Sequence, residues 1–285
     1  MKSPGYVRLG VGLVLSTLIA CGGTASGPSS PSALLPGPAD PLRGGETIFA
    51  DDFESGTLDA WQDGKNPSKQ RVVTASDAQS GNHYLAVTYP AGADGGWLTR
   101  FFMPGYQSMY VSFYVRFPRG WTGGTKLAGF YGSRVDDQWS GFGKGGACPN
   151  GTDFFDTMVV AEQIGNPGPL RFYSYYPEMA REPDGQVCYG RFGNQVGQAS
   201  YEGTVTLRAD VWHHIEFAVQ LNTPGNADGT QIFWVDGKQG AVWNNMKLRD
   251  SDILRLNSLQ LSFSAGGVPQ TQELHMDSIE VRTPR

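Results

Sequence analysis

The stretch MYVSFYVRF, from Met109 to Phe117, decides the fold class. Its apolar residues occupy every second position, and more polar residues occupy the positions between them. Successive side chains of a β-strand point to opposite faces, so this period of two predicts a strand with one face in a core. The core face would carry Val111, Phe113, Val115 and Phe117, and the other face Tyr110, Ser112, Tyr114 and Arg116.

Other segments on both sides of this stretch have the same period of two. HHIEFAVQL (213–221), SLQLSFSAGG (258–267) and ELHMDSIEVR (273–282) alternate, and TQIFWVDGK (230–238) runs into an Asp236-Gly237 hairpin turn. Turn residues such as NTPGNADG (222–229) separate them. No apolar period of helical length stands out. The chain is therefore predicted to be all-β, as a β-sandwich or jelly roll.

The composition agrees with an exported domain of short strands and many turns. Of the 285 residues only 17% are charged, and the chain has 39 glycines and 18 prolines. The formal net charge of −5 argues against nucleic acid as a partner. A local positive patch could still bind an anionic ligand, because binding of an anion depends on the charges near its site and not on the net charge of the chain.

The N-terminal residues have the pattern of an export signal. Lys2 and Arg8 flank the start of an apolar run, Leu9–Ala20, that is too short to span a bilayer. The run ends in LIAC, which resembles the lipobox of bacterial lipoproteins. Residues 1–20 are therefore predicted to be a lipoprotein signal peptide, with Cys21 lipidated and the protein anchored to a membrane of the cell envelope, periplasmic or surface-facing. The alternative is an ordinary cleaved signal peptide.

Two further regions follow the signal. Residues 21–45 are rich in Pro, Ser and Gly and cannot bury enough apolar surface to fold, so they are predicted to be a disordered tether. Residues 46–285 show no second shift of composition and no internal repeat, and their length suits one large β-sandwich.

Cys148 and Cys188 are the cysteines of the predicted domain. In an exported protein an even pair indicates a disulfide, which would restrict a loop of about 40 residues and contribute roughly 3–4 kcal/mol. The alternative is two free buried thiols. No Cys-x-x-Cys or histidine-rich spacing indicates a metal site.

Several segments, taken in order, resemble a known family. IFADDFESGTLDAWQ (48–62) resembles the first strand of secreted members of the concanavalin A-like lectin/glucanase superfamily. YVSFYVRFPRGWTGGTKLAGFYG (110–132), WHHIEFAVQLNTPGNADGTQIFWVDGKQ (212–239), NNMKLRD (244–250), LQLSFSAGG (259–267) and HMDSIEV (275–281) together resemble polysaccharide lyase family fourteen and its glucuronan- and alginate-lyase-like relatives. The resemblance implies a concanavalin A-like jelly roll with a sugar groove on its concave sheet. It also implies β-elimination on a uronate-containing polysaccharide.

The resemblance also implies which residues act. In the family a lysine in a GGKLPG-like segment and two tyrosines of a Tyr-x-Tyr strand are the working residues. Here GGTKLAG places Lys126 on the first, and RFYSYYP places Tyr173 and Tyr175 on the second. Two positions apart on a strand, these tyrosines are expected to face the same side. The family's SARxMW strand falls on FFDTMVV (154–160), where Thr157 takes the place of the arginine.

The chemistry of elimination gives these residues roles. The uronate carboxylate must be neutralised, a base must take the C5 proton, and an acid must protonate the leaving oxygen. Lys126 is assigned to the carboxylate, and Tyr173 and Tyr175 share the base, acid and positioning roles, in an order left open. No cofactor is required for this chemistry, and a structural calcium ion is left open.

Further residues are candidates for substrate binding. No acidic residue lies between Asp94 and Asp136, yet five cations do, which indicates an anion-binding patch unless those charges are simply solvated. The pair His213-His214 is expected to be structural. The predicted substrate-binding residues are Arg134, Arg171, Gln163, His83 and Tyr131.

The sequence thus predicts an exported lipoprotein, monomeric, that binds and cleaves an acidic polysaccharide. One alternative is a non-catalytic carbohydrate-binding lipoprotein on the same fold, which Thr157 favours. Another is an adhesion or structural module without a sugar ligand. Hydrolysis is disfavoured, since the chain lacks the Glu-x-Asp-x-x-Glu run of laminarinase-type hydrolases with this fold.

Overall fold

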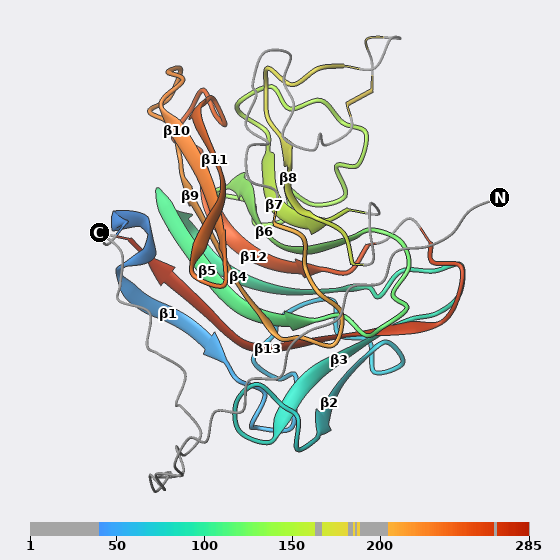
Figure 1. Ribbon diagram of the computed structural model, residues 1–285. Helices are drawn as coiled ribbons and strands as arrows, with labels where there is room; N and C mark the ends of the chain where they lie inside the picture. The colour runs from blue at the N-terminus through green and yellow to red at the C-terminus, as the bar shows by residue number, and fades with distance from the viewer. Residues whose placement is uncertain are drawn as a thin grey trace, which may run out of the picture. The chain divides into compact units, whose positions relative to one another are not determined.

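The structure is a computed structural model that describes residues 40–162, 167–181, 185, 187–188, 205–264 and 267–284. These residues form thirteen strands and one 3-10 turn, η1 (Pro41–Arg43) (Figure 1). The described part contains no α-helix, and none of its segments is a helix long and apolar enough to cross a membrane. The prediction of an all-β chain is confirmed.

The larger sheet has eight strands, all paired antiparallel. Its order is β11-β10-β9-β5-β13-β3-β2, and β1 pairs with β13 beside this path. The strands are β1 (Glu46–Asp51), β2 (Gln70–Thr74), β3 (His83–Tyr89), β5 (Ser108–Arg116), β9 (His213–Gln220), β10 (Gly229–Val235), β11 (Lys238–Met246) and β13 (Gln272–Thr283).

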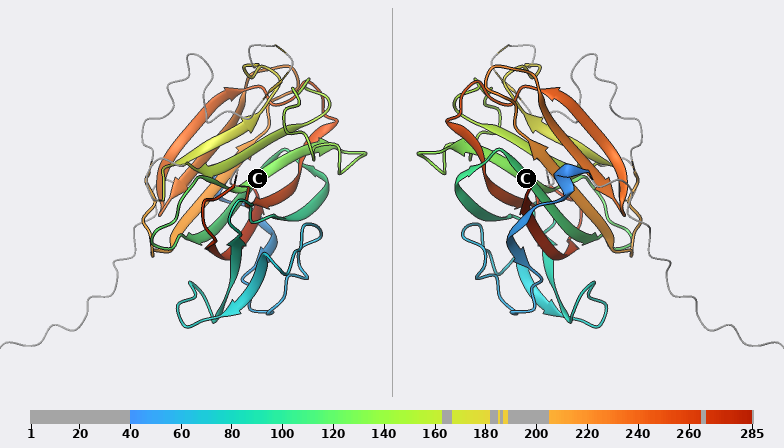
Figure 2. Two further views of the ribbon diagram at one scale, coloured as in Figure 1. Left: turned by 90° about the vertical axis from the view of Figure 1, so that its right-hand side faces the viewer. Right: turned by 90° about the vertical axis from the view of Figure 1, so that its left-hand side faces the viewer.

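The smaller sheet has five strands, again antiparallel, in the order β4-β12-β6-β7-β8. The strands are β4 (Trp97–Tyr106), β6 (Thr125–Arg134), β7 (Phe155–Ala161), β8 (Leu170–Tyr175) and β12 (Leu254–Ser262). Figures 1 and 2 show the two sheets as stacked layers, which is the sandwich that the alternating pattern predicts.

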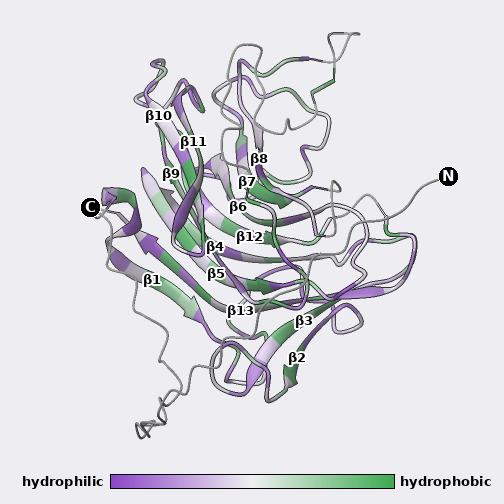
Figure 3. Cartoon of the chain, in the orientation of Figure 1, coloured by the Kyte–Doolittle hydropathy of each residue, from purple (hydrophilic) through white to green (hydrophobic). Residues whose placement is uncertain are grey.

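The core lies between the sheets and is built from the predicted apolar positions. Val111, Phe113 and Val115 of β5 are fully buried. Phe130 of the smaller sheet stacks on Phe217 of the larger one, with ring centroids 5.8 Å apart. Figure 3 shows hydrophobic and hydrophilic residues interleaved along strands such as β3 and β13. Each large apolar side chain removed from water in this way contributes about 1.5–3 kcal/mol.

The predicted hairpin between β10 and β11 is also present. Val235 pairs with Lys238 across the turn, and Asp236 and Gly237 between them have φ values of 51° and 78°. Positive φ at both central residues matches the type I′ turn, which favours Asp-Gly because its twist suits the flanking strands.

The turn η1 lies in the part of the chain that the sequence assigns to the tether. Two nitrogens of Arg43 donate to the Glu216 carboxylate, Nε at 2.8 Å and Nη2 at 2.7 Å. The Tyr110 hydroxyl donates to the same carboxylate at 2.8 Å. Glu216 is almost fully buried, so these donors neutralise it and hold η1 against the larger sheet.

A disulfide joins Cys148 and Cys188, as predicted. It links the segment between β6 and β7 to the segment that follows β8, and the Cys188 amide donates to the carbonyl of Gly146 at 3.0 Å. The bridge closes a loop with a sequence separation of 40, which in the chain-entropy account stabilises the fold by roughly 4 kcal/mol.

Candidate active site

Lys126 faces away from the core because β6 contains a β-bulge. Phe130 points into the core, and strict alternation would place Lys126 on the same side. The register between β6 and β7 shifts between Lys126 and Ala128, so that Leu127 is an extra residue. Leu127 and Ala128 are both fully buried, whereas Lys126 is partly exposed. The bulge therefore turns Lys126 to the face of the smaller sheet opposite the core, here called the site face.

Tyr173 and Tyr175 of β8 share the site face with Lys126. Their ring centroids lie 5.9 Å apart in an edge-to-face arrangement, as expected for two residues separated by one position on a strand. The Nζ atom of Lys126 lies 4.6 Å from the centroid of the Tyr173 ring, within the range of a cation–π contact. The three predicted catalytic residues thus converge on one site.

A pocket of about 130 Å³ lies at this point of the site face. It is bounded by β6, β7, β8 and the segment between β6 and β7, which the disulfide ties down. Its lining combines the positive charge of lysines, one carboxyl group and tyrosine phenols. The residues that line it are Lys126, Tyr131, Gly141, Gly143, Lys144, Gly145, Phe154, Asp156 and Tyr175.

Asp156 is the one acidic residue of this lining, and the sequence analysis did not select it. Its Cα is in register with Tyr131 on β6 and with Tyr175 on β8. The side chain is 6% exposed, and burial raises the pKa of its carboxyl to about 7, opposed by the charge of Lys126. Its Oδ1 atom has no hydrogen-bond partner among the described residues. The available signal was a lone acid inside the apolar run FFDTMVV (154–160).

Tyr131 was predicted to bind substrate, and it lines the pocket. Its hydroxyl donates to Gln260 Oε1 at 2.8 Å, and Gln260 Nε2 in turn donates to the Thr99 hydroxyl at 3.2 Å. Burial, together with the negative charge of Asp156, raises the pKa of the Tyr131 phenol well above its usual value. Tyr131 is therefore a neutral hydrogen-bonding group rather than a base.

Thr157 does not face the site. Its side chain is fully buried on the core side of β7, and its hydroxyl donates to the carbonyl of Phe130 at 3.2 Å. An arginine at this position would point into the sandwich. The β7 positions on the site face are the neighbours of Thr157, namely Asp156 and Met158, because the strand alternates. The sequence-based placement of the missing arginine at Thr157 is therefore off by one residue.

Arg171 lies on β8 and is already paired. Its Nε atom is 2.6 Å from Glu162 Oε2. Burial raises the pKa of Glu162, and the charge of Arg171 opposes that shift. Arg171 is not part of the pocket lining, and Gln163, also predicted to bind substrate, lies outside the described residues.

Arg134 and His83 are not brought to the pocket. Arg134 ends β6, where both Nε and Nη2 bond to Asp136 at 2.9 Å. His83 belongs to the larger sheet, where Nδ1 lies 3.2 Å from Glu54 and Nε2 lies 3.0 Å from the Thr74 hydroxyl. Both side chains are thus held by local partners and neither lines this pocket, so their role in substrate binding stays a prediction.

The predicted anion-binding patch is also absent from the described residues. Arg116 pairs with Asp77 at 2.8 Å on the larger sheet, and Arg119 pairs with Asp210 at 3.1 Å. Arg100 donates to the carbonyl of Ala60 at 3.0 Å. The five cations between Asp94 and Asp136 thus lie on both sheets and on the segment between β5 and β6, and Lys126 is the one of them that lines the pocket.

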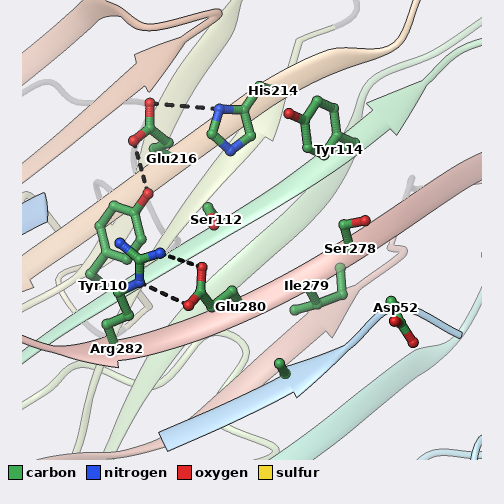
Figure 4. Close-up of a pocket in the computed structure, with 11 residues that line it drawn as sticks. Asp52, Tyr110, Ser112, Tyr114, His214, Glu216, Ser278, Ile279, Glu280 and Arg282 are labelled. Carbon is green, nitrogen blue, oxygen red and sulfur yellow. Dashed lines mark hydrogen bonds and ion pairs between the residues drawn. The ribbon is translucent and has the colours of Figure 1, made fainter. Parts of the chain in front are cut away.

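A larger hollow of about 580 Å³ lies on the outer face of the larger sheet (Figure 4). Most of its charged side chains are paired within it: Glu216 accepts from Tyr110 at 2.8 Å, and Arg282 bonds to Glu280 at 2.9 and 2.6 Å. His214 stacks on Tyr114 with ring centroids 4.6 Å apart. Because these groups are already paired, few of them are left to take part in a reaction.

His213 has a structural role, as expected. Its Nδ1 lies 2.8 Å from Asp236 Oδ2, and its Nε2 accepts the amide of Arg208 at 2.9 Å. Within the described part of the chain, no group of three or more His, Cys, Asp or Glu side chains could hold a metal ion.

Comparisons with known proteins identify the family of the chain. The family model of polysaccharide lyase 14 matches residues 77–275. By sequence, no curated protein matches the chain. The alginate lyase vAL-1 from Chlorella virus is 18% identical with a TM-score of 0.63, covering 84% of this chain and 100% of its own.

Two further solved structures are similar at the same level. The marine PL-14 alginate lyase from Aplysia kurodai is 17% identical with a TM-score of 0.61, covering 84% of this chain and 100% of its own. The endo-β-1,4-glucuronan lyase from the fungus Trichoderma reesei is 17% identical with a TM-score of 0.54, covering 84% of this chain and 96% of its own. At these identities the likeness supports the fold. The family model covers well over half of the 285 residues, and the chain therefore belongs to the polysaccharide lyase 14 family.

Proposed function

We propose that this lyase binds a uronate-containing polysaccharide at the site face and cleaves it by β-elimination, with Lys126, Tyr173 and Tyr175 as the catalytic residues. The observation that carries the proposal is their convergence: Lys126 Nζ is 4.6 Å from the Tyr173 ring centroid, which is 5.9 Å from that of Tyr175. The segments that supply them, β6 and β8, are not neighbours in the sheet, and β7 lies between them.

The reaction needs a proton acceptor, a proton donor and a cation, and this site supplies all three types of group. A base removes the C5 proton of the uronate, and the electron pair forms the C4=C5 double bond. The C4–O bond to the neighbouring sugar then breaks, and an acid protonates the leaving oxygen, so that no water is consumed. Lys126 stabilises the carboxylate and the negative charge that develops on it. Tyr173 and Tyr175 share the two proton transfers.

The substrate class follows from the same charge. Lys126 and Lys144 line a small pocket whose one acid, Asp156, has a pKa raised by burial, and this favours an anionic sugar. The similar structures named above are described as alginate lyases and as a glucuronan lyase. Alginate and glucuronan are therefore the first substrates to test.

The test is to incubate the purified protein with alginate, glucuronan and a neutral polymer, and to follow the ultraviolet absorbance of the unsaturated product. We expect absorbance to rise with at least one uronate polymer and not with the neutral one. No product from any uronate polymer, with binding retained, would overturn the proposal and favour a carbohydrate-binding protein without catalysis.

We also propose that the protein is an exported lipoprotein with its lipid on Cys21, on the strength of the LIAC sequence after the apolar run. Expression in a bacterium should place the full chain in the membrane fraction, and Cys21→Ser should release it. The same fractionation of both proteins, or an N-terminal peptide without lipid by mass spectrometry, would contradict this proposal.

A further inference from the structure

We propose that Asp156 binds the substrate as a neutral carboxylic acid, donating a hydrogen bond to the uronate carboxylate, so that the pocket accepts its substrate only while this proton is present. The inference rests on the proposed function, because it requires a uronate in the pocket beside Lys126. Asp156 received no role in the site from the sequence analysis, although it lies in the segment FFDTMVV (154–160), one residue before Thr157.

The position of Asp156 in the site is the first argument. It lies on the central strand of the three that form the site, in register with Tyr131 on one side and Tyr175 on the other. Its side chain lines the same pocket as Lys126. A sugar that contacts Lys126 and Tyr175 must therefore pass within reach of the Asp156 carboxyl.

The state of the carboxyl is the second argument. Asp156 is 6% exposed, and its Oδ1 atom has no hydrogen-bond partner among the described residues. A buried polar atom without a partner costs about 1–3 kcal/mol, so such an atom in a pocket wall is suited to meet a ligand. Lys126 does not satisfy this atom with a hydrogen bond, and its Nζ lies over the Tyr173 ring instead.

The surroundings of Asp156 supply only a limited positive charge. Burial is the largest influence on its carboxyl, and it raises the pKa to about 7, while the Lys126 charge lowers it. The phenols around it are hydrogen-bonding groups, and Tyr131 remains neutral because its pKa is raised. The titratable groups that face the pocket with Asp156 or adjoin it are Lys126 and Tyr131 from β6, Tyr173 and Tyr175 from β8, and Lys144 from the segment between β6 and β7.

The charge of the substrate decides between the two forms of Asp156. An ionised Asp156 would place a second negative charge beside the uronate in a pocket of about 130 Å³, and the two would repel. A protonated Asp156 can instead donate to the uronate and leave Lys126 to balance its charge. Binding of the anion further favours the protonated form, because a like charge nearby raises the pKa of a carboxyl.

The experiment is a pH profile of kcat/KM from pH 5 to 9 for the wild type, Asp156→Asn and Asp156→Ala, on the uronate polymer that gives product. The asparagine amide can donate the same hydrogen bond but does not titrate. We expect the wild-type kcat/KM to fall about tenfold per pH unit above the pKa of Asp156. Asp156→Asn should lack this alkaline fall and exceed the wild type at pH 9, whereas Asp156→Ala should lose at least about tenfold at pH 6.

Two results would overturn the inference while the proposed function stands. One is an alkaline fall in Asp156→Asn as steep as in the wild type. The other is an equal loss at pH 6 in Asp156→Asn and Asp156→Ala, both with wild-type circular dichroism. If the wild type forms no product, the proposed cleavage fails, and calorimetry with a uronate tetrasaccharide at pH 6 and 9 tests Asp156 alone. Binding that weakens at pH 9 in the wild type but not in Asp156→Asn supports the inference, and any other result contradicts it.

Discussion

The Nζ atom of Lys126 lies 4.6 Å from the centroid of the Tyr173 ring, and this contact exists because one extra residue in β6 turns the lysine away from the core. Without the bulge at Leu127, strict alternation from Phe130 would direct Lys126 into the sandwich. The bulge thus places a charged side chain on the same face as Tyr173 and Tyr175 of β8.

Replacement of Lys126 should affect the chemistry more than the fold. Lys126 is partly exposed, so Lys126→Ala should cost little stability. Loss of a preorganised cation at the developing charge should lower kcat by about 10²–10³-fold. Steady-state kinetics on the active uronate polymer measures this, with Lys144→Ala as the matched control that removes the other lysine of the pocket and should lose less. Equal losses in the two variants would show that general positive charge, and not Lys126, matters.

Loss of the hydroxyl of Tyr173 or Tyr175 should lower catalysis more than loss of the Tyr131 hydroxyl. Tyr173→Phe and Tyr175→Phe each remove a hydroxyl without removing the ring, and we expect kcat to fall by about 10²–10⁴-fold if that hydroxyl transfers a proton. Tyr131→Phe removes only the hydrogen bond to Gln260 and should change kcat by less than about tenfold. Kinetics of the three variants checks this order, and a larger loss in Tyr131→Phe would reverse the assignment.

Gly129 should be intolerant of a side chain. It sits on β6 opposite Met158, and an added Cβ would lie 2.4 Å from the Met158 Cβ. Gly129→Ala should therefore lower the free energy of unfolding by about 1–3 kcal/mol, since the sheet must shift to relieve the overlap. Gly145→Ala is the control, because nothing lies within 4 Å of a Cβ placed there. Urea unfolding of both variants measures the difference, and equal stabilities would contradict the packing at Met158.

Asp156 should reduce stability at alkaline pH. The folded protein keeps the Asp156 proton up to about pH 7, whereas the ordinary pKa of 3.8 applies once the chain unfolds. Between these values the folded state binds more protons, so the free energy of unfolding contributed by Asp156 falls as pH rises and stays low above pH 7. Asparagine does not titrate, so Asp156→Asn should gain stability relative to the wild type from pH 4.5 to pH 8, by about 3 kcal/mol. Urea unfolding of both proteins at pH 4.5 and pH 8 measures the gain. A stability difference between the two proteins that is the same at both pH values would contradict the raised pKa of Asp156.

The strands were predictable because alternation follows from local geometry. MYVSFYVRF became β5, and the Asp236-Gly237 hairpin formed where its turn chemistry placed it. Lys126, Tyr173 and Tyr175 came from the family resemblance, since spacing alone does not bring separate strands together.

The rest depended on register and on three-dimensional contacts. The bulge at Leu127 has no clear signal in the sequence, and Thr157 was assigned to the site because an offset of one residue exchanges the two faces of a strand. Asp156 was overlooked because the depth of its burial, which sets its pKa, appears only in the packed structure. Arg134 bonds to Asp136, a local contact that the charge pattern alone does not reveal.

The central claim is cleavage by elimination, and the masses of the products test it most directly. The wild-type protein should be incubated with a uronate tetrasaccharide in water labelled with heavy oxygen, with Lys126→Ala in parallel. The account predicts that the fragments carry no heavy oxygen from solvent at the cleaved bond. The fragment from the reducing side of that bond should carry an unsaturated uronate at its new non-reducing end and be lighter by one water than the hydrolysis product, and Lys126→Ala should form almost none of it. Heavy oxygen incorporated at the cleaved bond, or unsaturated product formed equally well by Lys126→Ala, would contradict it.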